Sequence, residues 1–236
     1  LVAALGWMLW FRNTPAEHPG VNEAELRLIA DRSVGGKTEP LHRPEWGDLL
    51  RSDRFWSLLA VSFGCTFMWQ FYITWFPTYL REKLHMTLQE SAVYAGLPFL
   101  LGVFGTWLGG LLTDGLSRRY EVRQARTVVG ACSLTMGGIL LSAGIWCTEP
   151  RLAAVLMAGG ALGVDLFLGA AWASAVEIGG AKGGAVAGAM NAASNFAGFL
   201  SPTFNGWVLE TFHDWNVFLM VAVAVNSSGA AAMAAA

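Results

Sequence analysis

Charge is the scarcest property of this 236-residue sequence, in which only 14% of the residues are charged and the net charge is −2. Soluble domains carry about 25% charged residues. A net charge close to zero gives no indication of a nucleic-acid partner. The three cysteines, Cys65, Cys132 and Cys147, and the four histidines lack the spacing of a metal site, a nucleotide-binding motif or a catalytic triad. We therefore expect no metal and no cofactor.

The charges that are present are confined to a few segments. Six apolar stretches of 21 to 27 residues contain one ionisable side chain, Asp165, and the other 31 charges lie outside them. A helix needs about 20 apolar residues to cross the hydrocarbon core of a bilayer. The sequence therefore predicts an all-α membrane protein with six transmembrane helices, at Phe55–Leu80, Ser91–Thr113, Thr127–Cys147, Leu152–Val176, Gly183–Leu209 and Trp215–Ala236.

The basic residues between these stretches predict the orientation. Residues 12–54, 114–126 and 177–182 hold twelve Lys and Arg residues, whereas the alternate connections hold three. Because cytoplasmic loops carry the excess of positive charge, the first set is predicted to face the cytoplasm of a cell membrane, such as a bacterial inner membrane. The opposite ends are predicted to carry an interfacial aromatic belt of Trp75, Tyr79, Trp146, Trp207 and Trp215.

The segments before the first full span predict the domain organisation. Residues 1–11 are apolar but too short to span a bilayer, so we interpret them as the end of a transmembrane helix of a longer protein. Residues 12–54 are polar and cannot build a hydrophobic core, so we interpret them as a cytoplasmic loop with short surface helices. One such helix is predicted to begin at Asn22, because Glu25 three residues later completes a capping box. Residues 55–236 are predicted to form the six-helix domain.

A motif at the cytoplasmic end of the second span allows two interpretations. Gly110, Asp114, Arg118 and Arg119 combine a helix-packing residue, an acid at the helix end and two bases in the loop. The acid and a nearby Arg could form a charge-assisted latch that breaks when helices move apart, or the segment could be an ordinary interfacial turn. The spacing resembles the G-x-x-x-D-x-x-x-R-[RK] loop signature of the major facilitator superfamily.

Further segments resemble one branch of that superfamily, the anion:cation symporters, which include sugar-acid and sialin-like transporters. Residues 15–26 are similar to its central loop, Tyr72–Leu80 to the outer end of its helix 7, and Ala171–Ile178 with Gly188–Asn195 and Pro202 to its helix 10–11 region. The resemblance implies that residues 1–11 end helix 6 and that the six spans are helices 7–12. It also implies an organic-anion substrate, protons or a cation as coupling ion, and a missing amino-terminal half that holds the carboxylate-binding Arg and the main proton-carrying acids.

Polar residues within the spans are the candidates for substrate binding. Asn191 and Asn195 share a helix face with Ser194 and Ser201, which favours either a substrate site or interhelical hydrogen bonds. Gln70 is the best candidate on the first span, where Thr66 and Thr74 are its neighbours at helical spacing, and Tyr72 is a weaker one. The resemblance implies that Asn191 and Trp172 match residues that bind the sugar acid; for Trp172 the alternative is a lipid-facing belt.

Asp165 lies near the middle of the fourth span, where a charge costs about 3 kcal/mol. The carboxyl group is therefore either protonated or exposed to an aqueous cavity. It could respond to protons or cations, or it could form a neutral interhelical hydrogen bond. The energetic cost favours the neutral form, for which Asp165→Asn is expected to preserve coupling.

These observations favour a secondary transporter that moves an organic anion, such as a sugar acid, by alternating access with coupled protons. The alternative is a membrane half-domain that transports nothing and has a structural or regulatory role. A membrane enzyme is a third possibility, but paired catalytic groups are missing from the predicted spans. A gene that encodes six preceding helices would favour the transporter, whereas a start codon directly before Leu1 would favour the half-domain.

Overall fold

The computed structural model describes residues 2–12, 14–28 and 46–235, and the chain divides into two units, Leu1–His42 and Arg43–Ala236. The first unit contains α1 (Val2–Trp10), a 3₁₀ turn at Pro15–Glu17 and a helix over residues 23–28. The predicted capping box is confirmed, because the Glu25 N–H donates to Asn22 Oδ1 at 2.9 Å and the Asn22 N–H to Glu25 Oε2 at 3.1 Å. Residues 29–45 of the predicted loop lie outside the described residues.

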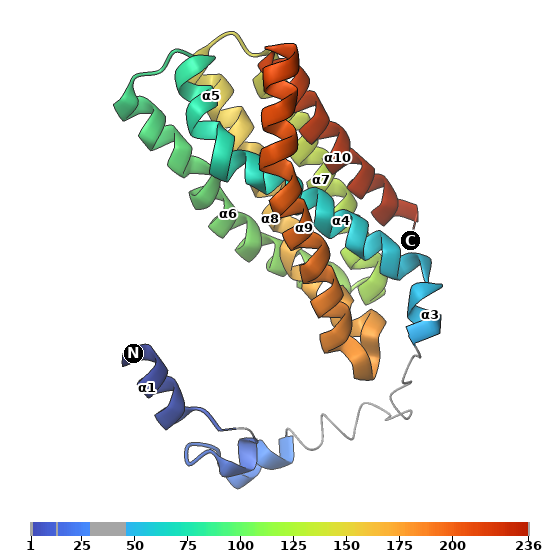
Figure 1. Ribbon diagram of the computed structural model, residues 1–236. Helices are drawn as coiled ribbons and strands as arrows, with labels where there is room; N and C mark the ends of the chain where they lie inside the picture. Colours follow the sequence, from blue (N-terminus) through green and yellow to red (C-terminus); the bar gives the residue numbers. More distant parts are fainter. Residues whose placement is uncertain (1, 13, 29–45, 236) are drawn as a thin grey trace. The chain divides into compact units, whose positions relative to one another are not determined.

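The second unit contains the six long helices that the sequence predicts. A short α3 (Trp46–Leu50) precedes a continuous helix made of α4 (Asp53–Gln70), a π-helical segment (Phe71–Trp75) and α5 (Phe76–Glu82). The other five are α6 (Leu88–Ser117), α7 (Val122–Trp146), α8 (Pro150–Gly179), α9 (Gly183–Phe212) and α10 (Trp215–Ala235). They run along one another in a single bundle and connect at alternate ends (Figure 1).

Length and hydropathy identify four helices in the described chain that could cross a membrane: Asp53–Glu82, α6, α7 and α8. The apolar stretch described in α10 is shorter, Trp215–Ser228. α9 has 30 residues but is not one of these four, and Gly, Ser and Asn are frequent in its sequence. Large apolar side chains are nevertheless exposed around the bundle, among them Val103 and Trp107 of α6 and Phe199 of α9. An apolar outer surface of this kind fits a lipid environment better than water.

Small residues allow the helices to approach closely. α8 packs most extensively against α6 and α7, and α4 packs against α9 and α10. Where α7 crosses α8, a Cβ added to Gly163 would lie 2.6 Å from the Gly137 Cα atom, so neither position can carry a side chain. Close backbone approach of this kind is how membrane helices gain packing energy without a hydrophobic driving force between them.

The π-helical segment has an identifiable cause in the sequence. Pro77 lacks an N–H and its ring would collide with the carbonyl four residues earlier in a regular helix. The helix widens just before it, so that the Phe76 N–H donates to the carbonyl of Phe71, five residues back. Such π-bulges are local accommodations that often occur near functional sites.

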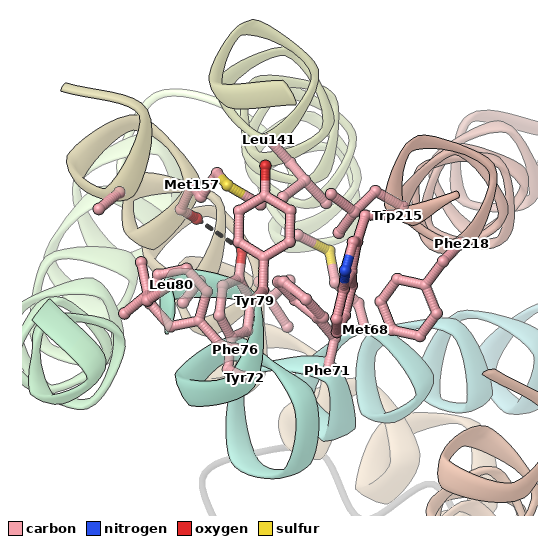
Figure 2. Close-up of a cluster of buried hydrophobic side chains, with 14 of the residues drawn as sticks. Met68, Phe71, Tyr72, Phe76, Tyr79, Leu80, Leu141, Met157, Trp215 and Phe218 are labelled. Atoms are coloured by element: carbon pink, nitrogen blue, oxygen red, sulfur yellow. Dashed lines mark hydrogen bonds between the residues drawn. The ribbon is translucent and has the colours of Figure 1, made fainter. Parts of the chain in front are cut away.

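An aromatic cluster surrounds this widened turn (Figure 2). Phe71 packs on Phe218 of α10 with ring centroids 5.6 Å apart, and Tyr79 on Trp215 at 5.5 Å. The predicted interfacial belt is therefore wrong for Tyr79 and Trp215, which are 1% and 8% exposed. Trp146 and Trp207 are exposed, as a belt requires. Packing against a neighbouring helix explains the difference, because a buried ring loses its contact with the interface.

Candidate functional site: a polar cavity among α4, α8 and α9

A cavity of about 190 Å³ lies between α4, α8 and α9, next to the middle of α8. Polar side chains from all three helices line it together with aromatic and aliphatic ones. Asp165 is its one charged lining residue, and no Lys, Arg or His takes part in the lining formed by the described chain. The lining residues are Ser62, Cys65, Thr66, Trp69, Val164, Asp165, Phe167, Leu168, Ala171, Trp172, Met190, Asn191 and Ser194.

α4 contributes one face to this cavity. Ser62, Thr66 and Trp69 are separated by four and three residues, so they project from the same side of a helix. Sequence reasoning placed Thr66 beside Gln70 but missed Ser62 and Trp69. Their spacing with Thr66 is the signal that could have identified them. The Ser62 hydroxyl donates to the Leu58 carbonyl within its own helix at 2.8 Å.

α8 places Asp165 and Trp172 on the same side of the cavity, seven residues and two turns apart. Trp172 is 44% exposed, so its indole forms an open wall of the cavity. Asp165 is 5% exposed and lies deeper in the bundle. The structure therefore brings together two residues that the sequence predicted as separate candidates.

α9 contributes Asn191, which lines the cavity, whereas Asn195 one turn later does not. The Asn195 side-chain amide donates to the Asn191 backbone carbonyl at 2.8 Å and to Asn191 Oδ1 at 3.2 Å. Asn195 thereby orients Asn191. Within the described chain the Asn191 amide N–H groups have no hydrogen-bond partner, so they are available to a bound molecule.

Gln70 and Tyr72, like Asn195, are candidates that do not line the cavity. The Gln70 side chain is held by α9, because Gln70 Nε2 donates to the Gly198 carbonyl at 2.9 Å. Tyr72 is 1% exposed, and its hydroxyl donates to the Met157 carbonyl of α8 at 2.7 Å (Figure 2). The π-helical segment begins directly after Gln70 and changes the helix phase, which the regular spacing of Thr66, Gln70 and Thr74 could not reveal.

Asp165 is backed by glycines of α6. A Cβ added to Gly102 would collide with Asp165 Oδ2, and one added to Gly105 would lie 3.2 Å from the Asp165 Cβ atom. These two positions therefore leave the space that the aspartate side chain occupies. No hydrogen bond or ion pair to Asp165 occurs within the described chain, so the neutral interhelical hydrogen bond considered above has no partner there.

The loop motif lies at the far end of α6. Asp114, Arg118 and Arg119 are exposed there, and none of them forms an ion pair with another described residue. Gly110 has no neighbour within 4 Å of an added Cβ; the glycine that packs against α8 is Gly109, next to the Leu166 carbonyl. The ion pair described at this end of the bundle links Arg126 of α7 to Glu177 of α8.

Comparison with known proteins assigns the family. The model of the Major Facilitator Superfamily matches residues 1–202. The probable sulfoacetate transporter SauU of Cupriavidus necator is 28% identical over 97% of this chain and 54% of its own length. The probable L-galactonate transporter of Escherichia coli is 26% identical over 97% of this chain and 51% of its own length. The probable galactarate/D-glucarate transporter GudP of E. coli is 26% identical over 88% of this chain and 49% of its own length.

The chain belongs to the Major Facilitator Superfamily. The family match and the apolar helices identify it as a multi-pass membrane protein. The chain spans about half the length of the curated relatives it matches. The predicted resemblance to a superfamily branch of sugar-acid and other anion transporters is confirmed by these relatives.

Proposed function

We propose that the chain is the carboxyl-terminal half of a secondary transporter that moves a small organic anion by alternating access, with protons as the coupling ion. The observation that carries the proposal is the cavity in which Trp172 and Asn191 meet, in a chain whose relatives are named as transporters of sulfoacetate and sugar acids. Binding sites at the bilayer midplane between two helix bundles are typical of such transporters.

The two side chains supply complementary chemistry. The N–H donors of Asn191 suit carboxylate and hydroxyl oxygens, which are the polar groups of a sugar acid. The half-exposed indole of Trp172 provides an apolar wall for the carbon skeleton, with its own N–H donor. Ser194 and Thr66 add hydroxyl groups beside them. A cationic partner for the substrate carboxylate would come from the amino-terminal half.

Two other predicted candidates have supporting roles in this proposal. Asn195 orients Asn191 through its two hydrogen bonds. Gln70 ties α4 to α9 next to the cavity and so fixes the distance between two of its walls. Tyr72 is fixed in the core by its bond to Met157 and serves packing.

The loop motif has a different role in this proposal. The proposed movement of the two bundles would make and break contacts at the cytoplasmic loop, which contains Gly110, Asp114, Arg118 and Arg119.

Exchange of labelled anions in proteoliposomes tests the proposal. The intact protein that contains this chain is expected to exchange at least one of D-glucarate, L-galactonate and sulfoacetate. Asn191→Ala is expected to weaken binding by about 1–3 kcal/mol, because a polar group of the substrate loses its partner, and Trp172→Ala is expected to weaken it as well.

The control is Ser133→Ala on α7, whose buried hydroxyl donates to the Gly130 carbonyl at 3.1 Å, away from the cavity. This variant is expected to retain the wild-type affinity. Equal losses in all three variants would indicate a folding defect in place of a binding site. A wild-type protein that exchanges none of the three anions would contradict the proposal.

A further inference from the structure

Asp165 is the ionisable side chain that the packing of the bundle isolates. It is buried, it lines the cavity from α8, and the described residues offer it neither a hydrogen-bond donor nor a cation. The sequence allowed Asp165 to be a neutral hydrogen-bond donor to a neighbouring helix, which requires an acceptor. The described residues provide no such acceptor, and Asp165 borders the cavity. The inference that follows rests on the proposed function, because it concerns how this cavity accepts an organic anion.

The described groups that face Asp165 include no positively charged side chain. α6 presents the glycines Gly102 and Gly105, which have no charge to offer. α4 contributes the titratable group Cys65 and the π-helical segment contributes Tyr72, whose hydroxyl already donates to the Met157 carbonyl. From α9 the neutral residues Met190, Asn191 and Ser194 line the cavity, and α7 meets this part of α8 through glycine and serine. An ionised Asp165 therefore has no counter-charge among the described residues.

An organic anion in the same cavity would place a second negative charge beside this carboxylate. Two like charges in a shared, poorly hydrated site cannot both persist, so one group takes up a proton. The Asn191 amide and a cation from the amino-terminal half would stabilise the charge of a bound sulfonate or sugar-acid carboxylate. The bound anion is then a weaker base than Asp165, so Asp165 is the group that takes up the proton. The glycine wall of α6 prevents the side chain from moving away from the cavity on that side.

We propose that Asp165 is a proton-binding site of this bundle whose protonation accompanies anion binding. When the anion enters, a carboxylate oxygen of Asp165 forms an O–H bond with a proton from a hydronium ion, whose own O–H bond breaks to leave neutral water. When the anion leaves, that O–H bond breaks and the proton returns to water on the side to which the cavity is open. Each bound anion is thus accompanied by a proton held in this half of the transporter.

Binding measurements on the intact protein that contains this chain test the proposal, with D-glucarate as the probe. In the wild-type protein, affinity is expected to fall as the pH rises, by about tenfold per pH unit where Asp165 is ionised before binding. Titration calorimetry in buffers of different ionisation enthalpy is expected to show proton uptake with the anion. Asp165→Asn removes the site, so the variant is expected to bind with one fewer proton and a flatter pH dependence.

Two further variants exclude trivial explanations. Glu210→Gln changes the same charge at an exposed position of α9 outside the cavity and is expected to leave the pH dependence unchanged. Asp165→Glu restores a carboxyl group and is expected to restore proton uptake. If Asp165→Asn takes up as many protons as the wild type, with the same pH dependence, the proposal is overturned.

Infrared difference spectroscopy without any anion separates this inference from the proposed function. Acidification is expected to produce a carboxylic C=O band in the wild type that is missing in Asp165→Asn. Identical bands in both proteins would overturn the assignment of the proton site. A wild-type protein that shows the band but binds none of D-glucarate, L-galactonate and sulfoacetate would overturn the proposed function and, with it, the linkage to an anion.

Discussion

At the scale of single residues, the fit of Asp165 against α6 leads to a stability prediction. Gly102→Ala would drive a methyl group into Asp165 Oδ2, and overpacking of this kind costs about 1–3 kcal/mol. Shortening the aspartate makes room, so Gly102→Ala is expected to cost clearly less in an Asp165→Ala background. Thermal unfolding of the four members of this double-mutant cycle in detergent measures the coupling.

Gly96 of the same helix provides the matched control, because nothing lies within 4 Å of a Cβ added there. Gly96→Ala is expected to leave stability unchanged or slightly raised. A cost for Gly102→Ala that is the same in both backgrounds would show that the methyl group is not opposed by the carboxyl group.

The residue scale also shows where sequence reasoning was limited. Asp165 and Asn191 were identified because carboxyl and amide groups are conspicuous in apolar helices, and Trp172 because its segment resembles a helix of the family; the structure places all three at one cavity. Ser62 and Trp69 were missed because serine and tryptophan are common in membrane helices and carry no signal alone. Whether Gln70 turns to the cavity or to a carbonyl depends on a neighbouring helix, which a single sequence does not describe.

At the scale of helices, α4 and α9 are joined by side chains that donate to backbone carbonyls across the interface. Ser201 donates to the Phe67 carbonyl at 2.9 Å and Gln70 to the Gly198 carbonyl at 2.9 Å. We expect Gln70→Ala to lower the free energy of unfolding by about 1 kcal/mol, the usual contribution of one such bond. Ser201→Ala is expected to lower it by more, because the Ser201 hydroxyl also accepts from Asn205 Nδ2 at 2.9 Å. Chemical or thermal unfolding in detergent provides the measurement.

Ser142→Ala is the control for this interface, since the Ser142 hydroxyl donates to the Gly138 carbonyl one turn earlier in its own helix. Loss of that local bond is expected to leave stability nearly unchanged, because Ser back-bonding does little for a helix. Losses of the same size in all three variants would contradict a special role for the α4–α9 bonds.

Helix existence and type were predictable because apolar runs of bilayer length allow little else. The interruption within the first of them was not predicted. Pro77 was visible in the sequence, but a proline can kink, break or widen a helix, and the choice depends on packing partners such as Phe218 and Trp215. The same partners explain why Tyr79 lies in the core and not in an interfacial belt.

At the scale of the whole molecule, the cavity is bordered by one bundle only. The 236 residues alone are therefore not expected to transport any anion, because a second bundle must close the other side for alternating access. Uptake of labelled D-glucarate into vesicles that contain only these residues, compared with empty vesicles, provides the test. Saturable uptake by the chain alone would contradict the two-bundle mechanism.

The widened turn at Phe71–Trp75 fixes the rotational setting of everything that follows it in the helix. In a regular α-helix each residue turns the chain by about 100°, so the same residues wound without the widened turn would present the outer part rotated by about that angle. Tyr79 and Leu80 would then point away from the partners that bury them, while Ser62 and Thr66 would keep their places at the cavity. One extra residue in the widened turn thus allows the two parts of a single helix to pack against different neighbouring helices.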